Sequence, residues 1–246
     1  MKPGYPDGAA VQLEVSIASK MYTNAAGNRQ QALAGFNFVL SEGEVGVFVG
    51  PSGCGKSTML RIVVGLDPDY KGRVSRPPGA KIGMVFQEPR LLPWRSVDEN
   101  VRLVAPHADE KRLAMLFETL GLEDHRSHFP GELSLGLARR VAVARAFAVE
   151  PDFLILDEPL ASLDDALAAR LREQIATLVD SRTVTTLLVT HNVDDAVQLG
   201  DRLFFLSQRP SHVIAEVPIH TPRAQRGPDE LKRIKAELSR LTLANL

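Results

Sequence analysis

The sequence predicts an α/β fold with a mainly parallel sheet, because short strand-like runs alternate with segments of helical spacing. The runs are rich in branched and aromatic residues, which are typical of strands. They are VGVFV (45–49), KIGMVF (81–86), FLIL (153–156), TTLLV (185–189) and RLFFL (202–206). Since the runs are almost wholly apolar, we expect strands that are buried on both faces, as in a parallel sheet covered by helices.

The stretch between residues 91 and 150 has a different character. RLAMLFETL (112–120) and LGLARRVAVARAFAV (135–149) look helical, and no clear strand-like run accompanies them. This pattern predicts a helical subdomain that is inserted into the sheet core. Within a single domain 1–246, the expected parts are a core over 11–90 and 151–220, the helical subdomain 91–150, and a C-terminal helical extension 221–246.

Two further segments show the spacing of amphipathic helices. Residues 164–179 place four apolar side chains on one helical face, which we expect to pack in the core: Leu167, Leu171, Ile175 and Leu178. The C-terminal run PDELKRIKAELSRL (228–241) repeats the pattern through Leu231, Ile234, Leu238 and Leu241. This second stripe can pack either on its own domain or on a partner.

Charge and composition exclude several classes of protein. With 29 basic and 30 acidic residues, the chain lacks the broad positive surface of a nucleic-acid-binding protein. No apolar run approaches the roughly 20 residues that span a bilayer, and the first residues, MKPGYPDGAA, lack the apolar stretch of a secretory signal. The single cysteine, Cys54, agrees with a reducing compartment. We therefore expect a cytosolic protein that can dock on a membrane partner.

The run GPSGCGKST fits the phosphate-binding pattern G-x-x-x-x-G-K-[ST], directly after one strand-like run and before a helical segment. Its residues are Gly50, Pro51, Ser52, Gly53, Cys54, Gly55, Lys56, Ser57 and Thr58. Glycines let the backbone curl so that successive N–H groups face one anion, and the following helix adds the positive end of its dipole. We expect Lys56 to reach the β- and γ-phosphates of a nucleotide and the Ser57 hydroxyl to bind Mg²⁺.

A pair of carboxylates ends the buried run PDFLILDEP. Acidic groups at the carboxyl end of such a strand are well placed beside bound phosphates in an open α/β sheet. We expect Asp157 to hold Mg²⁺ through water, and Glu158 to take a proton from the attacking water or to orient it.

Three further matches follow in order, and with them the chain resembles the ATP-binding subunit of an ABC transporter over nearly its whole length. Gln87 in MVFQEPRLLPW matches the Q-loop, Asp164 in ASLD the D-loop, and His191 in LLVTHNVDDA the switch histidine. Tyr22, in SKMYTNAAGNRQQAL, lies where the family places an aromatic ring that stacks on adenine.

The resemblance implies a P-loop NTPase (RecA-like) core with an antiparallel β part beside the parallel sheet. It implies that His191 contacts the γ-phosphate, that Gln87 senses Mg²⁺ and water, and that Asp164 joins the nucleotide-binding residues. The catalytic set that it implies is Glu158, His191, Gln87 and Lys56. The metal set is Ser57, Gln87 and Asp157.

The stretch LSLGL, residues 133–137, precedes ARRVAVARAFAVEPDFLILDEP at the spacing of the ABC signature LSGGQ. Ser134 is a natural N-cap for the helix that follows. In the family, the serine hydroxyl and the amide of the second glycine meet the γ-phosphate of ATP that the opposite subunit holds. Those two residues, Ser134 and Gly136, are present, whereas Leu135 and Leu137 depart from the motif. The resemblance therefore implies a degenerate but usable signature.

The implied function is an ATPase that forms a homodimer around two Mg²⁺–ATP molecules and drives a separate membrane permease, on the cytoplasmic face of the inner membrane. The stretches LLPWRSVDENV (91–101) and LSQRPSHVIAEV (206–217) are similar to the importer branch for nitrate, sulfonate or taurine, which implies indirect partnership with a solute-binding protein. Trp94 can face the permease or pack within the subdomain.

Three other functions remain open at this point. LARRVAVARA (137–146) also resembles ATPase subunits for another cargo, such as those of lipid trafficking. A soluble ABC-type ATPase of DNA repair or translation would carry a long coiled coil or a second ATPase domain, and neither is visible. A small-molecule P-loop kinase would have an acceptor site and would not need the ordered set of Gln87, Ser134, Asp164 and His191.

Overall fold

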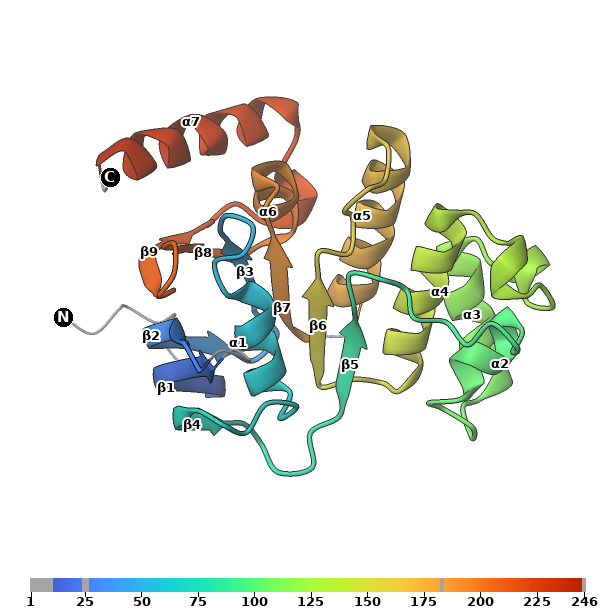
Figure 1. Ribbon diagram of the computed structural model, residues 1–246. Coiled ribbons are helices and arrows are strands. Elements are labelled where there is room, and N and C mark those ends of the chain that lie inside the picture. The colour runs from blue at the N-terminus through green and yellow to red at the C-terminus, as the bar shows by residue number, and fades with distance from the viewer. Residues whose placement is uncertain (1–10, 24–26, 182–183, 245–246) are drawn as a thin grey trace. The chain divides into compact units, whose positions relative to one another are not determined.

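The computed structural model describes residues 11–23, 27–181 and 184–244 (Figure 1). The run MKPGYPDGAA lies outside these residues. The chain divides into two units, of which the first comprises Met1–Gly79 with Leu188–Leu246 and the second Ala80–Leu187. The predicted division into core, helical subdomain and C-terminal extension stays a prediction.

The first unit contains a three-stranded antiparallel sheet in the order β2-β1-β4. Its strands are β1 (Val11–Thr23), β2 (Arg29–Ser41) and β4 (Lys71–Ser75). Along β1, Leu13, Val15 and Ile17 are buried and alternate with exposed neighbours, because successive side chains of a strand point to opposite faces. This sheet is the antiparallel β part that the resemblance implied.

The first unit also holds strands that run in parallel. β3 pairs in parallel with β8, and β8 pairs in antiparallel with β9. Their bounds are β3 (Val45–Val49), β8 (Arg202–Leu206) and β9 (Val213–Pro218). All five residues of β3 are buried, as its apolar pattern predicts. The ring of Phe48 stacks on that of Phe204, with centroids 4.5 Å apart, and the pair forms the centre of an aromatic core with Phe36 and Phe38.

In its described part, the first unit contains the α-helices α1 (Lys56–Val63), α6 (Val193–Leu199) and α7 (Pro228–Ala244), with the 3₁₀ turn η3 (Arg223–Gln225). Helix α7 packs on α6 through Ile234 and Leu238, which are buried (Figure 1). The guanidinium of Arg226, just before α7, donates to the main-chain oxygens of Val197 and Gly200 at 2.9 and 2.7 Å. The C-terminal stripe was expected to pack either on its own domain or on a partner. Its described part packs on its own domain, and the side chain of Leu241 lies outside the described residues.

The second unit contains the parallel pair β5 (Ile82–Val85) and β6 (Phe153–Asp157) and most of the helices. The helices are α2 (Val97–Arg102), α3 (Glu110–Leu120), α4 (Leu135–Ala148) and α5 (Asp165–Asp180), with 3₁₀ turns η1 (Glu123–His125) and η2 (Pro130–Glu132). Strand β7 (Thr185–Thr190) crosses the boundary between the two units. Residues 91–150, all of them described, are helical with no strand, as predicted.

The core stripe of α5 is confirmed. Leu171, Ile175 and Leu178 are buried and Leu167 is half-buried. Helix α4 approaches β5 closely, because a Cβ on Gly83 would lie 2.3 Å from the main-chain oxygen of Ala146. Glycine is therefore needed at position 83 for the helix to pack there. Among the described residues, no helix is both long and apolar enough to cross a membrane.

Candidate nucleotide site

The phosphate loop follows β3 and leads into α1, which is the predicted order. Gly53 and Gly55 have φ angles of 78° and 123°, a backbone region that other residues rarely adopt. A Cβ on Gly55 would also lie 3.0 Å from Cδ2 of Leu33. Both the backbone conformation and the space around it thus require glycine at position 55. The curled loop leads directly into the first turn of α1, so the beginning of the helix lies beside the loop.

The amino end of α1 differs from those of α2, α3, α4 and α5. In these four helices, Ser96, Asp109, Ser134 and Asp164 accept a hydrogen bond from the first turn. In α1 the N-cap is Gly55, no side chain caps the helix, and the first turn contains no acidic residue. The first N–H groups of a helix need an acceptor, and the helix dipole favours an anion there. A phosphate group is an anion that would meet both needs.

Lys56 lies along the loop and is 6% exposed. Its Nζ donates to the main-chain oxygens of Gly50 and Pro51 at 2.8 and 3.0 Å. These bonds hold the cation over the curl of the backbone, so the positive charge and the open helix end belong to one site. The Ser57 side chain is exposed, whereas Thr58 is buried.

Tyr22 is held by its hydroxyl, which donates to Oδ2 of Asp67 at 3.0 Å. Lys20, 2% exposed, forms an ion pair with Asp67 at 2.7 Å, and its Nζ lies 4.7 Å from the centroid of the Tyr22 ring. Burial opposes ionisation of Asp67, but the bonds from Lys20 and Tyr22 prevail and lower the pKa of that carboxyl. The Tyr22 residue is 38% exposed, so it offers accessible surface to a partner.

His191 follows β7 directly and is exposed. The next residue, Asn192, caps α6 by accepting a hydrogen bond from the N–H of Asp194 at 2.8 Å. The N–H of Asn192 donates to the hydroxyl of Thr190 at 3.0 Å. These bonds on both sides of His191 determine where its backbone lies at the strand end.

In the second unit, Asp157 ends β6 and is 9% exposed. Glu158 begins the following turn with a φ of 47°, and Ser162 in the same turn has a φ of 63°. Non-glycine residues adopt this region at a cost and persist there only when their surroundings hold them. The N–H of Ala161 donates to the main-chain oxygen of Glu158 at 3.2 Å, which closes the turn.

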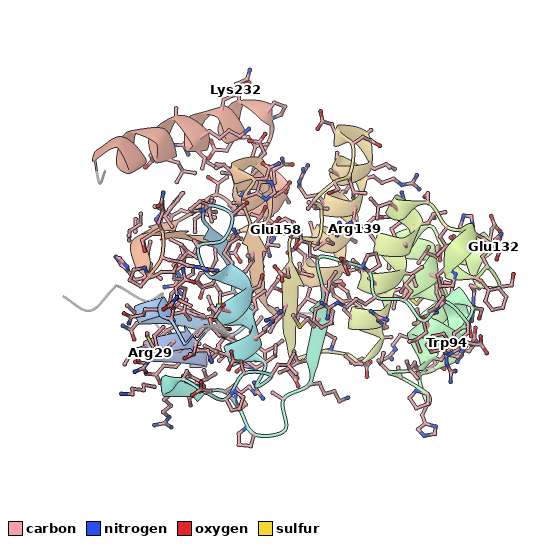
Figure 2. All side chains as sticks on the ribbon, in the orientation of Figure 1. Arg29, Trp94, Glu132, Arg139, Glu158 and Lys232 are labelled. Atoms are coloured by element: carbon pink, nitrogen blue, oxygen red, sulfur yellow. The ribbon has the colours of Figure 1, made fainter. Side chains whose placement is uncertain are left out.

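Sequence reasoning missed Arg139, which holds this turn from outside. Its guanidinium donates to the main-chain oxygens of Ala161 and Glu158 at 2.7 and 3.4 Å (Figure 2). The available signal was the adjacent pair Arg139 and Arg140 at the start of a mostly apolar helical run, since buried cations require acceptors.

Gln87 is exposed in the loop after β5. This loop is held by Arg145 of α4, whose guanidinium donates to the main-chain oxygens of Pro89 and Arg90 at 2.8 and 2.9 Å. Burial lowers the pKa of Arg145. The guanidinium of Arg90 lies 4.3 Å from the centroid of the Phe86 ring, which adds a cation–π contact to the loop.

The predicted cap at the start of LSLGL is confirmed, because Oγ of Ser134 accepts a hydrogen bond from the N–H of Leu137 at 3.2 Å. Leu135 is 46% exposed and Leu137 is half-buried. Gly136 is buried, and a Cβ there would lie 3.3 Å from Cδ1 of Leu167. The second glycine of the motif therefore has a packing role as well as its implied nucleotide contact.

Asp164 caps α5 by accepting a hydrogen bond from the N–H of Leu167 at 2.9 Å. The expected site residues are shared between the two units. Tyr22, residues 50–58 and His191 belong to the first. Gln87, Ser134, Gly136, Asp157, Glu158 and Asp164 belong to the second.

A sequence model of one family, described as "ABC transporter", matches residues 33–161. The chain belongs to this family. This ABC protein is 42% identical over 204 residues to "Aliphatic sulfonates import ATP-binding protein SsuB 2" of Pseudomonas syringae pv. tomato. The match covers 82% of this chain and 87% of the relative. It is 37% identical over 203 residues to "Aliphatic sulfonates import ATP-binding protein SsuB" of Bacillus licheniformis. This match covers 79% of this chain and 80% of the relative.

Solved structures show the same fold. One is the "dimeric structure of a post-hydrolysis state of the ATP-binding cassette MJ0796 bound to ADP and Pi", with a TM-score of 0.73 at 27% identity, covering 86% of this chain and all of the other. Another is cbiO1 from Clostridium perfringens, with a TM-score of 0.73 at 26% identity, covering 96% and 99%. Family membership and the geometry of the phosphate loop together identify this ABC protein as an ATPase.

Proposed function

We propose that this ABC protein hydrolyses ATP to power the import of small organic sulfonates through a separate permease. The observation that carries the ATPase part is the uncapped amino end of α1 with Lys56 beside it, which suits the phosphate chain of a nucleotide. The cargo follows from the names of the relatives, which cover about four fifths of the chain or more. Nitrate importers belong to the same branch and are the alternative within it, whereas taurine is itself a small organic sulfonate.

ATP binds with its phosphates at the loop and its adenine on Tyr22. The N–H groups of the loop and of the first turn of α1 donate hydrogen bonds to the negatively charged phosphates. Lys56 exchanges its bonds to the loop oxygens for bonds to the β- and γ-phosphates. The exposed surface of Tyr22 stacks on the base, while its hydroxyl stays bonded to Asp67.

Hydrolysis uses Glu158 to take a proton from the attacking water or to orient it. His191 contacts the γ-phosphate from the end of β7. Gln87 would sense whether Mg²⁺ and the attacking water are in place. These roles are consistent with the position of each residue at the carboxyl end of a strand, the edge where open α/β sheets bind ligands.

The proposed Mg²⁺ ligands fit a hard cation, because every donor is an oxygen. Ser57 offers an exposed hydroxyl in the first turn of α1, Asp157 a carboxylate at the end of β6, and Gln87 an amide oxygen in an exposed loop. When bound, the metal would neutralise charge on the phosphates. Ser57 would bind it directly and Asp157 would hold it through water.

Two copies of the chain enclose two ATP molecules. Ser134 and Gly136 of each copy face the γ-phosphate that the other copy holds, and Asp164 joins the interface. In support, Ser134 is exposed at the beginning of a 14-residue helix, whose dipole favours an anion.

The permease binds the second unit, on the cytoplasmic face of the inner membrane. A hollow of about 340 Å³ there is lined by β5 and the loop after it, by α4, and by the two residues that follow α2, with Phe86, Leu103 and Val104 among its residues. Leu103 and Val104 are 48% and 42% exposed. Trp94 is 70% exposed and so is not packed within its subdomain (Figure 2). A helix of the permease would cover these side chains, and the solute-binding protein would act through the permease.

Proteoliposomes that contain this ATPase with its co-expressed permease test the cargo. We expect a solute-binding protein loaded with an alkanesulfonate to raise the rate of phosphate release, whereas nitrate leaves it at the unstimulated rate. Stimulation by nitrate alone would reject sulfonates as the cargo and leave the ATPase assignment standing.

A further inference from the structure

Arg139 is a buried cation in α4, five residues after Ser134. It is 5% exposed, and neighbouring residues of the helix such as Val141, Ala142 and Val143 are apolar and buried. A buried guanidinium is unfavourable unless its donors are paired. Among the described residues, Nε of Arg139 has no hydrogen-bond partner. The hydrogen bonds that Arg139 does make must therefore offset the unfavourable free energy of burying its charge.

Those contacts go to one turn. Nη2 donates to the main-chain oxygen of Ala161 at 2.7 Å, and Nη1 donates more weakly to that of Glu158 at 3.4 Å (Figure 2). One acceptor belongs to the left-handed residue Glu158 itself, and the other, the oxygen of Ala161, directly precedes the left-handed Ser162. Because such a backbone persists only where it is held, two bonds from a rigid helix are suited to hold it.

The charges of Arg139 and Glu158 also interact at this turn. Burial lowers the pKa of Arg139, and the negative charge of Glu158 works against that shift. The carboxylate of Glu158 thus lies within electrostatic range of the guanidinium. The guanidinium itself bonds to main-chain oxygens of the turn.

We infer that Arg139 is a positioning residue, which couples the helix that begins at the signature to the turn that carries Glu158. The link runs within one chain, from Ser134 along the first turns of α4 to Ala161 and Glu158. A displacement of α4 when Ser134 meets ATP would then shift the turn of Glu158. This inference rests on the proposed role of Glu158.

The test measures kcat and KM for ATP in Arg139→Gln and Arg139→Lys, with the melting temperature of each. We expect Arg139→Gln to lower kcat about tenfold and to leave KM within about twofold, since the phosphate loop is untouched. Arg139→Lys should recover part of the loss, because it keeps the charge and can donate to one carbonyl.

Arg112→Gln is the matched control. Its guanidinium also donates to a main-chain oxygen, that of Ala148 at 2.8 Å, at the opposite end of α4 and away from the turn. This variant should keep the kcat of the parent. Equal losses in Arg112→Gln and Arg139→Gln, each in proportion to a lowered melting temperature, would show that Arg139 only supports the fold, and would overturn the inference.

A double-mutant cycle with Glu158→Gln separates this inference from the proposed function. If Arg139 acts through Glu158, Arg139→Gln should not slow the residual turnover of Glu158→Gln any further. Full turnover by Glu158→Gln would reject the proposed base, and the inference with it. Loss of turnover in Glu158→Gln but wild-type turnover in a stable Arg139→Gln would overturn the inference alone.

Discussion

At the scale of single residues, Lys56 is the buried cation of the phosphate loop. We expect Lys56→Ala to weaken ATP binding at least about tenfold, because charge-assisted bonds to the β- and γ-phosphates are lost. Equilibrium titration with ATP measures the change. Lys232→Ala, which removes a lysine whose side chain is 81% exposed on α7, is the control and should bind ATP like the parent. Parent-like affinity and turnover in Lys56→Ala would reject the phosphate-loop role.

Tyr22 allows its ring and its hydroxyl to be tested separately. Tyr22→Phe loses the bond to Asp67 but keeps an aromatic face, so we expect ATP affinity close to that of the parent. Tyr22→Ala should weaken binding by roughly 1–3 kcal/mol, the usual contribution of a base stacked on an aromatic side chain. The same ATP titration measures both variants. Tight binding by Tyr22→Ala would show that adenine lies elsewhere.

At the scale of an element, the signature is the amino end of α4. Ser134→Asp should keep the helix cap, because aspartate caps about as well as serine, while adding a negative charge where the γ-phosphate of the second copy is expected. In a Glu158→Gln background, we expect an unchanged melting temperature and no ATP-dependent dimer by light scattering. Ser134→Ala is the counterpart, since it lowers stability by about 1 kcal/mol without adding charge.

ATP-dependent dimerisation of Ser134→Asp at the parent's ATP concentration would mean that LSLGL is only a helix start. Gly136→Asp is a less selective variant. Its Cβ would press on Leu167, at 3.3 Å from Cδ1, so a loss of dimer there could come from disturbed packing between α4 and α5.

The junction of β1 with the loop after α1 contains the buried pair Lys20 and Asp67. Burial alone would lower the pKa of Lys20, but the bond to Asp67 outweighs it and raises that pKa. The pKa of Asp67 is lowered from 3.8. Asp67 thus stabilises the fold above its unfolded pKa and loses this effect as pH falls through its folded pKa. Lys20 stabilises the fold below 10.5 and loses this effect as pH rises through its own folded pKa.

Asp67→Asn leaves Lys20 charged and buried without its main partner. We expect the free energy of unfolding at pH 7 to fall by roughly 3 kcal/mol. The difference from the parent should shrink as the pH falls from 3.8, the unfolded value, through the lowered pKa of folded Asp67, where this carboxyl becomes protonated. Urea denaturation across this pH range measures it. Asp229→Asn, on a side chain that is fully exposed, should change little, and an equal loss there would contradict the assignment.

At the scale of the whole molecule, we propose that exposed residues of the second unit connect this ATPase to its permease. We expect Trp94→Ala to reduce permease-stimulated ATP hydrolysis several-fold, because a largely exposed aromatic side chain is a frequent anchor of protein interfaces. Proteoliposomes with the permease provide the measurement, and the isolated protein provides the comparison. Equal stimulation of parent and variant would place the permease elsewhere.

Much of the molecule was predictable because its signals are local. The phosphate loop requires glycine for its backbone angles, buried parallel strands require unbroken apolar runs, and Ser134 begins a helix by bonding within its own first turn. The alternating pattern of β1 is also local and could have been found from Leu13, Val15 and Ile17.

The sequence by itself determined the order of strands, loops and caps, since each depends on a few neighbouring residues. Only the tertiary structure decided which distant acceptors a buried cation finds. Arg139 bonds to a turn about twenty residues further along the chain, and Lys20 pairs with Asp67 across 47 residues. Tertiary packing likewise placed α7 on α6 and left Trp94 exposed. These outcomes depend on contacts between segments far apart in the chain, which local pattern does not encode.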